Sequence, residues 1–595
     1  MIRPISVGLL LVLAGVALQA QEGEKVFQTI CSTCHREGAP DAPAPATLRS
    51  LPWQTILTAL ESGKMTAIGG TLSGEQRDAV AKYLGTAGAE AITQSAHCRG
   101  AAPAMKGAPG WTSWGVDGSN SRFQSAKAAG LNSSDVPKLK LKWAFGFPGV
   151  TTAFGTPTVY GGRVFVGSAD GTVYSLNAQT GCIYWMYKAN DGVRTAISIS
   201  GDGQTAYFGD LHAYAHAVNA NTGVPLWKVH VEEHPEAAIT GTPRLEGGRL
   251  YVPVSGGDEE VAAGNPAFVC CRFRGSLVAL DAKTGKQIWK SYTISEEAKL
   301  TGKTANGTEV WGPAGVSVWS PPTVDAAKHA VYFGTGVNFT QPATNTSDAV
   351  MALDLNTGGK LWTQQLLPGD VFNFGCNTEQ KLNCPQDPGK DLDIGASPML
   401  KSLGGGKRLL VVAAKSGMAY GLDPDKQGKI VWQTRIGNGG GQGGVIWGGS
   451  SDDKVAYYSI SDWNPGKPEA GGGVVAVEIA SGKILWTTPA PVPACLGSKG
   501  CSAAQPGATS LIPGVVFAGS LDGHLRGYDT ASGKIIWDFD TLQDFMTVNG
   551  IKARGGAING TGPTIVGGML YANAGYSRFP VMAGNVFLAF SVDGK

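Results

Sequence analysis

The chain has 595 residues, and its 48 basic and 46 acidic side chains leave a formal net charge of only +2. A balance this close gives no indication of nucleic acid or an anionic membrane surface as a partner. Its 86 Gly and 33 Pro lie between short β-branched and aromatic runs, which is typical of many tight turns and argues against disorder.

Residues 1–20 are predicted to be a signal peptide. Arg3 gives a positively charged start, the apolar run 7–18 is too short to span a bilayer, and small residues lie near Ala20. Leu18 is not the ideal small residue for a cut after Ala20, and an uncleaved anchor is the alternative. No later run is long and apolar enough for a transmembrane helix. We therefore expect a periplasmic or secreted protein that is not an integral membrane protein.

Residues 21–88 are predicted to form a small α-helical cytochrome c domain. An amphipathic helix over 23–30 runs into the motif Cys31-Ser32-Thr33-Cys34-His35. This Cys-x-x-Cys-His spacing allows two thioether bonds to haem c and places the histidine beneath the iron as an axial ligand. A thioredoxin-like or zinc site is the alternative, but neither needs a histidine directly after the second cysteine.

Met65 is predicted to be the sixth iron ligand. It lies in the Gly-rich stretch SGKMTAIGG, ahead of a predicted helix over 72–84 in which Ser73 and Gln76 form a capping box. A thioether opposite imidazole raises the reduction potential of the iron. Ordinary packing of the methionine is the alternative. A linker rich in Ala, Gly and Pro, residues 89–110, is predicted to follow.

Residues 111–595 carry a repeat, of which VALDAKTGKQIW at 278–289 is representative: a strand, an Asp turn closed by Thr-Gly, and a second strand ending in Trp. The seven complete copies end at Trp185, Trp227, Trp289, Trp362, Trp432, Trp486 and Trp537. The C-terminal FLAFSVDGK and the early LKLKW are two halves of an eighth copy. Joining them closes a ring, which removes exposed sheet edges. We therefore predict an all-β eight-bladed propeller; an open solenoid or two sandwiches are the alternatives.

The chain holds ten cysteines, and eight lie outside the haem motif, an even number that an oxidising compartment can pair fully. Cys270 and Cys271 are adjacent, so they form either a strained ring with each other or bonds to two separate partners. Spacing suggests the remaining pairs Cys376 with Cys384, Cys495 with Cys501, and Cys98 with Cys182.

The repeat AxDxxTGKxxW, the eight units, the adjacent cysteines and the haem motif together resemble the quinoprotein alcohol dehydrogenases. The resemblance covers essentially the whole mature chain. It implies an eight-bladed propeller that holds pyrroloquinoline quinone (PQQ) and a calcium ion on its axis. The cytochrome domain in front and the stretch CCRFRGSLVALDAKTG are most similar to the polyvinyl alcohol dehydrogenase branch. No GxGxxG unit opens a helix, which argues against a nicotinamide or flavin fold.

The resemblance implies a set of PQQ-binding residues. Trp319, which is not a blade-ending Trp, would form the floor under the quinone, and a structural Trp is the alternative. Lys415 would contact the quinone oxygens. The carboxylates would be held by Arg194, with Thr242 and Ser255 as hydroxyl donors. A solvated face is the alternative for both cations. Whether Cys270 and Cys271 lie against the quinone stays open, because they follow the expected calcium ligand in sequence.

Calcium ligands and a catalytic base are implied in the same way. Glu259 in SGGDEE matches the family's calcium Glu, whereas Asn338 stands one place beyond the position of the family's Asn. The base that takes the alcohol proton is assigned to Asp391 in KDLDIGASPML, with Asp393 second and Asp370 third. A carboxylate near a metal ion stays ionised, as a base must at neutral pH.

These expectations describe a dehydrogenase that oxidises alcohols or polyols, including the secondary alcohols of polyvinyl alcohol, with PQQ. Electrons would pass through haem c to an external cytochrome c or copper protein. A non-enzymatic propeller scaffold of the outer-membrane assembly type is one alternative, although the haem motif and the absence of a lipobox Cys near Ala20 count against it. A PQQ dehydrogenase for sugars or aldehydes is the other.

Overall fold

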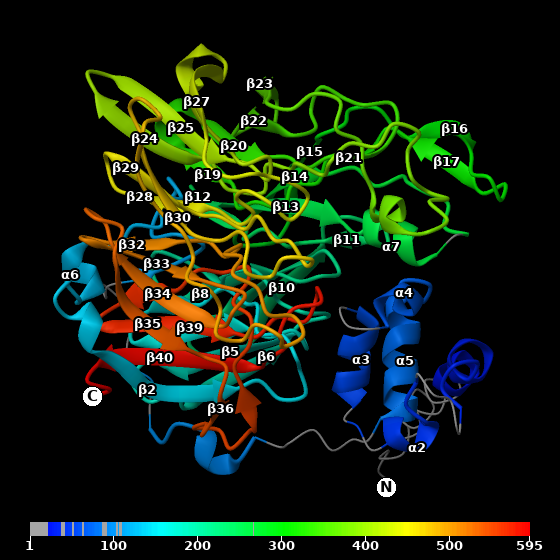
Figure 1. Cartoon of the computed structure of the whole chain (residues 1–595), viewed down its shortest axis with the longest axis horizontal. Helices are drawn as coiled ribbons and strands as arrows, with labels where there is room; N and C mark the ends of the chain where they lie inside the picture. Colours follow the sequence, from blue (N-terminus) through cyan, green and yellow to red (C-terminus); the bar gives the residue numbers. More distant parts are fainter. Residues whose placement is uncertain are drawn as a thin grey trace, which may run out of the picture.

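The computed structural model describes residues 22–36, 42–49, 51, 53–61, 65–85, 92–100, 102, 105, 110–265 and 267–595. The expected signal peptide lies outside the described residues. Within them, no helix has the length and apolar character needed to cross a membrane. Figure 1 shows a small helical domain beside a large assembly of β-sheets.

The helical domain consists of short helices around an apolar core. A helix over 22–31 ends in a π-turn, η1 (Phe27–Cys31), and is followed by α2 (Pro45–Leu48), α3 (Trp53–Glu61), α4 (Thr66–Gly69) and α5 (Gly74–Leu84). The predicted capping box is confirmed, because Ser73 Oγ accepts the Gln76 amide at 3.2 Å and Gln76 Oε1 accepts the Ser73 amide at 3.1 Å. Val80 and Leu60 lie buried between α5 and α3.

Over residues 110–595, the described strands form eight sheets of four or five strands, which confirms the predicted propeller. The first four are β3 (Thr158–Tyr160), β4 (Arg163–Gly167), β5 (Thr172–Asn177) and β6 (Ile183–Lys188), with β1 (Gly110–Trp111) beside β3; β7 (Ser198–Ile199), β8 (Thr205–Gly209), β9 (Tyr214–Asn219) and β10 (Pro225–His230); β11 (Ala237–Ala238) and β12 (Arg244–Glu246) on β13 (Arg249–Gly256), then β14 (Ser276–Asp281) and β15 (Gln287–Tyr292); and β19 (Thr323–Asp325), β20 (Ala330–Gly334), β22 (Ala349–Asp354) and β23 (Lys360–Gln365).

The remaining four sheets complete the ring. They are β24 (Met399–Gly404), β25 (Lys407–Ala413), β26 (Met418–Asp423) and β27 (Lys429–Arg435); β28 (Gly449–Ser451), β29 (Val455–Ser459), β30 (Val474–Glu478) and β31 (Ile484–Thr488); β32 (Ser510–Ile512), β33 (Val515–Gly519), β34 (His524–Asp529) and β35 (Ile535–Asp540); and β38 (Thr564–Val566), β39 (Met569–Ala574), β40 (Val586–Val592) and β2 (Leu139–Gly146).

Short elements decorate the blades. They are the pairs β16 (Lys299–Lys303) with β17 (Glu309–Gly312), β18 (Ala314–Gly315) with β21 (Asn338–Thr340), and β36 (Asp544–Phe545) with β37 (Ala553–Arg554), the helices α6 (Ala126–Ala129) and α7 (Asp258–Gly264), and the 3₁₀ turns η2 (Gln94–Ala96), η3 (Val136–Lys138), η4 (Ala326–Lys328), η5 (Phe374–Asn377) and η6 (Pro424–Lys426). Figure 1 places α7 next to α4 of the helical domain, and the two helices are in contact.

The ring closes through the split repeat, as the sequence predicts. Strand β2 pairs antiparallel with the C-terminal β40, in a register that runs from Leu139 opposite Val592 to Gly146 opposite Val586. The indole N–H of Trp537 in the neighbouring blade donates to the Leu139 carbonyl at 3.0 Å. The first and last parts of the array therefore share one blade, and that blade is hydrogen-bonded to the next.

The turn glycine of a repeat and the Trp of the preceding one join adjacent blades, as the third copy shows. Asp281 accepts the backbone amide and hydroxyl of Thr284 at 2.8 and 2.7 Å, which folds the turn so that Gly285 takes a φ of 72°. The ring of Trp227 from the preceding blade lies over this glycine, where a Cβ would stand 2.8 Å from the indole. The same indole donates to the Ala282 carbonyl at 3.0 Å. The repeat thus encodes the contact between blades as well as the blade itself.

Gly223→Ala tests this joint. Gly223 has a φ of 74° and lies under Trp185, where a Cβ would stand 2.7 Å from the ring. Gly248 has a φ of 76° but open space around it, so Gly248→Ala is a matched control for the backbone cost alone. We expect Gly223→Ala to lower the free energy of urea unfolding by about 1–3 kcal/mol more than the control does, because it also displaces the indole. Equal losses would contradict the proposed packing role.

The three disulfides suggested by spacing are present, and of the two alternatives for the adjacent cysteines the structure has the bond between them. Adjacent Cys270 and Cys271 bond to each other, and the other pairs are Cys98–Cys182, Cys376–Cys384 and Cys495–Cys501. Cys31 and Cys34 of the haem motif are the two cysteines left unpaired, and the ten are all among the described residues. The Cys98 bridge ties the segment after the helical domain to the first blade.

Candidate active site

A cavity of about 270 Å³ lies where the propeller meets the helical domain. Six residues singled out in the sequence line it: Arg194, Ser255, Glu259, Trp319, Asp393 and Lys415. Leu60, Gly70 and Arg77 of the helical domain also contribute to the lining. The site is therefore built by both domains.

A buried cluster of one cation and two carboxylates lies at the cavity. Lys415 Nζ is 3.0 Å from Asp391 Oδ1 and 2.6 Å from Asp393 Oδ2, and all three residues are buried. Burial raises the pKa of Asp391 well above its usual range, while Lys415 opposes that shift. Burial by itself would lower the pKa of Lys415, but Asp391 and Asp393 raise it overall. Lys415 is therefore charged at neutral pH, and it lowers the pKa of Asp391 against the effect of burial.

The two aspartates of this cluster are held differently. Asp393 also accepts the Val337 amide at 2.7 Å through Oδ1, so both of its oxygens have partners. Asp391 adopts a φ of 58°, and its Oδ2 faces Gly441, where a Cβ would stand 3.0 Å away. Oδ1 of Asp391 is thus bound by Lys415, while Oδ2 lies beside the backbone of Gly441.

Asp370 supports the loop that carries these residues. Its carboxylate accepts the backbone amides of Lys390, Asp391 and Leu392 at 2.8, 3.3 and 2.8 Å. Asp370 is absent from the lining formed by the described residues. The structure therefore gives this third-ranked candidate a positioning role behind Asp391.

Two tryptophans and an arginine form an aromatic wall. Trp319 lies 5.6 Å from Lys415 Nζ, and Trp447 meets it edge-on with ring centroids 5.1 Å apart. The guanidinium of Arg194 lies 3.9 Å from the Trp447 ring centroid, and the Trp447 indole donates to Asn559 Oδ1 at 2.7 Å. Burial lowers the pKa of Arg194 to about 10, which still leaves it cationic at neutral pH.

Helix α7 brings two glutamates to the cavity. Glu260 accepts a hydrogen bond from Arg578 at 2.9 Å. Burial, then Glu260, Asp391 and Asp393, raise the pKa of Glu259 well above its usual range. One carboxylate oxygen of each glutamate is buried without a hydrogen-bond partner among the described residues. An unpaired buried oxygen is costly, so these atoms are suited to bind a cation or a ligand.

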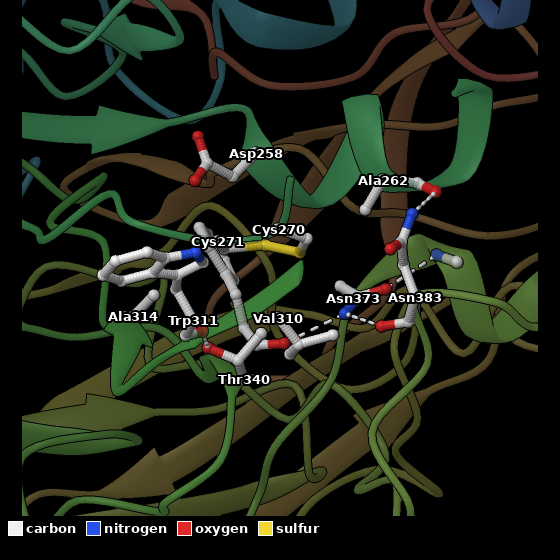
Figure 2. The surroundings of a disulfide bond; sticks show 12 residues. Asp258, Ala262, Cys270, Cys271, Val310, Trp311, Ala314, Thr340, Asn373 and Asn383 are labelled. Carbon is white, nitrogen blue, oxygen red and sulfur yellow. Dashed lines mark hydrogen bonds between the residues drawn. A yellow bond between two sulfur atoms is a disulfide. The ribbon is translucent and has the colours of Figure 1, made fainter. Parts of the chain in front are cut away.

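The adjacent cysteines are not part of the cavity lining formed by the described residues. Figure 2 shows the Cys270–Cys271 disulfide below α7, with Trp311 beside it. The chain that follows is held by α7, because Asp258 Oδ2 accepts the amides of Arg272 and Phe273 at 3.1 and 3.2 Å. The disulfide thus lies beneath α7 and outside the lining formed by the described residues.

Three other sequence assignments also fall outside this lining: Asp391, which is buried behind Lys415 and Asp393, Thr242 and Asn338. Thr242 Oγ1 accepts a hydrogen bond from the Ala196 amide at 2.9 Å, so its hydroxyl is engaged in a contact between two blades. The amide oxygen of Asn338 accepts the backbone amide and hydroxyl of Thr344 at 2.8 and 3.0 Å, and its Nδ2 donates to the Ala314 carbonyl. The side chain of Asn338 is therefore committed to the loop that follows β21.

The haem residues lie within the helical domain. His35 is buried, and its Nδ1 lies 2.9 Å from the Pro43 carbonyl. A hydrogen bond from Nδ1–H orients the ring and leaves Nε2 available to a metal. Met65 is partly buried against the core that contains Phe27 and Cys31. Residues 37–41 and 62–64, which flank these positions, are outside the described part of the chain.

Several lining residues escape the sequence motifs. Trp447 stands outside the blade-ending series, which is the same signal that singles out Trp319. Arg578, Asn559 and Gln442 belong to no recognisable pattern; Asn559 and Arg578 reach the cavity on loops of the blade that contains β38 to β40, and Gln442 on the loop between β27 and β28. They add a cation and two amides to the expected site.

Three family models match the chain. The model for "Cytochrome C oxidase, cbb3-type, subunit III" matches residues 18–84. The "Glucose/ethanol/alcohol dehydrogenase, beta-propeller domain" matches 267–436. The model described as "Outer membrane protein assembly factor BamB" matches 104–338, 415–550 and 470–595. Propeller repeats thus extend through the large domain, and a cytochrome c-like segment precedes them.

Relatives cover nearly the whole chain. A polyvinylalcohol dehydrogenase from Sphingopyxis sp. (strain 113P3) is 38% identical over 96% of this chain and 93% of the relative. Another from Pseudomonas sp. is 38% identical, with coverages of 97% and 94%. The crystal structure of quinohemoprotein alcohol dehydrogenase from Comamonas testosteroni shares the fold, with a TM-score of 0.59 at 18% identity over 82% of this chain and 81% of that one. The chain therefore belongs to the polyvinyl alcohol dehydrogenase family, whose members are PQQ-type propeller dehydrogenases, and it carries a cytochrome c domain.

Proposed function

We propose that the chain oxidises secondary alcohols, including those of polyvinyl alcohol, and delivers the electrons to its own haem c. The observation that carries this proposal is the buried Asp391–Lys415–Asp393 cluster, whose Lys415 and Asp393 line, together with Trp319, a cavity to which the cytochrome c domain also contributes. The names of the 38%-identical relatives support the choice of substrate.

The cavity residues fit PQQ, which is a flat tricarboxylate. Trp319 and Trp447 offer aromatic surfaces, and Arg194, Lys415 and Arg578 offer three cations at the same cavity. When bound, the quinone supplies the two-electron acceptor for the alcohol. The protein contributes the surfaces that orient it and the charges that balance its carboxylates.

Calcium fits the charge of the site. Glu259, Asp391 and Asp393 face a single lysine, and an oxygen of Glu259 is buried without a partner. A divalent cation would balance the excess negative charge, with Glu259 as the residue that holds it. Among the described residues, no group of three or more His, Cys, Asp or Glu is arranged as a metal site. Carbonyl or amide oxygens would therefore complete the shell, and Asn338 is not placed to be one of them.

Asp391 acts as the base in this proposal. It accepts the hydroxyl proton of the alcohol at Oδ2, the oxygen that faces Gly441. Lys415 bonds to Oδ1 and stabilises the ionised carboxylate against burial. Asp370 holds the backbone on both sides of the base and so keeps its unusual conformation in place.

The contact between the domains supports electron transfer to haem c. Helix α4 begins directly after Met65 and packs against α7, which carries Glu259 and Glu260. The segment that offers the sixth iron ligand therefore lies next to the wall of the cavity. We propose that the electrons then leave to an external cytochrome c or copper protein. Four disulfides agree with an oxidising compartment, so we place the protein in the periplasm or outside the cell.

Reconstitution tests the proposal. Purified protein supplied with PQQ and calcium should reduce an artificial dye when given pentan-2-ol or polyvinyl alcohol, and omission of PQQ or chelation of calcium should remove that activity. If haem is present and quinone is bound but no alcohol or polyol reduces the dye, the proposed function is wrong. Turnover with glucose or an aldehyde but not with an alcohol would favour a sugar or aldehyde dehydrogenase instead.

A further inference from the structure

A glycine-rich loop, residues 437–444, covers the base. The loop connects β27 to the β28 blade, and its Gly440 amide donates to the Lys415 carbonyl at 3.1 Å. Its Gly441 lies against Asp391, so the wall beside the base is backbone without side chains. Gln442 is the only residue that this loop adds to the lining formed by the described residues.

A short segment, Ser461 to Trp463, clamps both ends of this loop. Asp462 accepts the amides of Asn438, Gly439 and Gly444 at 2.7, 3.0 and 2.7 Å. Six loop glycines would otherwise make the loop flexible, because glycine restricts the backbone least. Three charge-assisted hydrogen bonds to one carboxylate therefore fix its conformation.

The same clamp fixes the backbone of Gln442. The Gln442 backbone carbonyl accepts hydrogen bonds from the Ser461 hydroxyl at 2.6 Å and from the Trp463 amide at 3.2 Å. Its side-chain amide, in contrast, has no hydrogen-bond partner within the described part of the chain, although the residue is only partly exposed. A primary amide can donate and accept hydrogen bonds, so this group is held at the cavity with its hydrogen-bonding capacity unused.

We propose that Gln442 is a specificity residue that hydrogen-bonds the second hydroxyl of a 1,3-diol while Asp391 takes the proton of the first, and that Asp462 is its positioning residue. The proposal rests on the proposed function. Polyvinyl alcohol carries a hydroxyl on every second carbon, so a 1,3-diol is its repeating unit. Gly440 has open space around it, whereas Gly441 packs closely against Asp391, so Gln442 follows directly on the backbone that touches the base.

Gln442→Ala tests the substrate contact. With the reconstituted enzyme, we expect KM for pentane-2,4-diol to rise about 3- to 10-fold, the effect of one lost hydrogen bond, while KM for pentan-2-ol stays within about twofold. The two alcohols differ in the second hydroxyl, so each serves as the control for the other. An equal change for both, or no change for either, would overturn the proposal.

Asp462→Ala tests the positioning role, with Asp452→Ala as the matched control. Asp452 lies in the same blade and accepts the amides of Lys454 and Val455, both at 2.8 Å, in a turn between β28 and β29. In the cofactor-free protein, Asp462→Ala should speed hydrogen exchange at the amides of residues 438, 439 and 444 about tenfold or more. Asp452→Ala should leave those amides unchanged.

The KM values for the two alcohols separate a positioning role of Asp462 from a general loss of structure. Asp462→Ala should reproduce the diol-selective rise in KM, and Asp462→Asn, which keeps the oxygen that binds Gly439 and Gly444, should restore part of it. Unchanged exchange, or a diol KM equal to that of the Asp452→Ala control, would overturn the role of Asp462. If the wild-type protein does not oxidise even pentan-2-ol, the proposed function fails. If it does, and the variants lose both alcohols equally, this inference alone fails.

Discussion

Asp391→Asn is expected to lower kcat by about 10²- to 10⁴-fold, the usual contribution of a general base. Asparagine keeps the shape of the side chain and can still accept the hydrogen bond from Lys415, so the cavity should remain intact. The haem spectrum and the binding of quinone, followed by quenching of Trp fluorescence, should therefore stay unchanged. The measurement is dye-linked turnover of pentan-2-ol by the reconstituted enzyme.

Asp393→Asn is the comparison that isolates the base. Both oxygens of Asp393 are already bound, by Lys415 and by the Val337 amide, so its loss should affect Lys415 and leave proton removal in place. We expect a smaller fall in kcat for Asp393→Asn than for Asp391→Asn. Full activity of the Asp391 variant would exclude it as the base and move the assignment to Asp393 or Asp370.

Lys415→Met should have the largest effect on stability. It removes the cation that two buried carboxylates share, and breaking a buried ion pair from one side costs about 3–5 kcal/mol. The measurement is the free energy of urea unfolding of the cofactor-free protein. Lys415 lowers the pKa of Asp391 in the folded protein, so its removal raises that pKa further and the folded variant binds a proton more readily than the folded wild type. The deficit of the variant should therefore shrink as the pH falls below neutral.

Lys401→Met is the matched control for this prediction. The Lys401 side chain is as buried as that of Lys415, at 8% exposure, but its partner Asp453 is 95% exposed. An exposed carboxylate is solvated once its partner is removed, so the pair itself contributes only about 0–1 kcal/mol. Equal losses for the two variants, or a deficit at Lys415 that does not depend on pH, would contradict the view that the carboxylates share a buried charge.

The repeat pattern predicted the propeller because it encodes contacts as well as strands. The Thr-Gly turn and the Trp of each copy meet at the joint between blades, as Gly285 and Trp227 show. The split copy predicted the pairing of β2 with β40 for the same reason. Trp319, Lys415 and the two aspartates were predicted from the resemblance to the quinoprotein alcohol dehydrogenases, and Trp319 also stands outside the blade-ending Trp series.

Other parts of the site could not be predicted from local sequence. Asn338 lies in β21, where side chains alternate between faces, so a displacement of one residue turns the amide away from the position that the family pattern gives it. Arg578 and Trp447 reach the cavity on loops of separate blades, and only the closed ring brings them together with Arg194. The position of the Cys270–Cys271 disulfide under α7 depends on Asp258, the first residue of that helix, which accepts the amides of the two residues after the cysteines.

The central claim is that oxidation of an alcohol in the propeller reduces the haem of the same chain. Anaerobic stopped-flow spectroscopy of the reconstituted protein, mixed with pentan-2-ol in the absence of any external acceptor, tests it most directly. We expect the haem c to become reduced, only when PQQ is bound, and to stay oxidised in Asp391→Asn. A haem that stays oxidised in the PQQ-loaded wild-type protein, or that is reduced equally well without PQQ, would contradict the account.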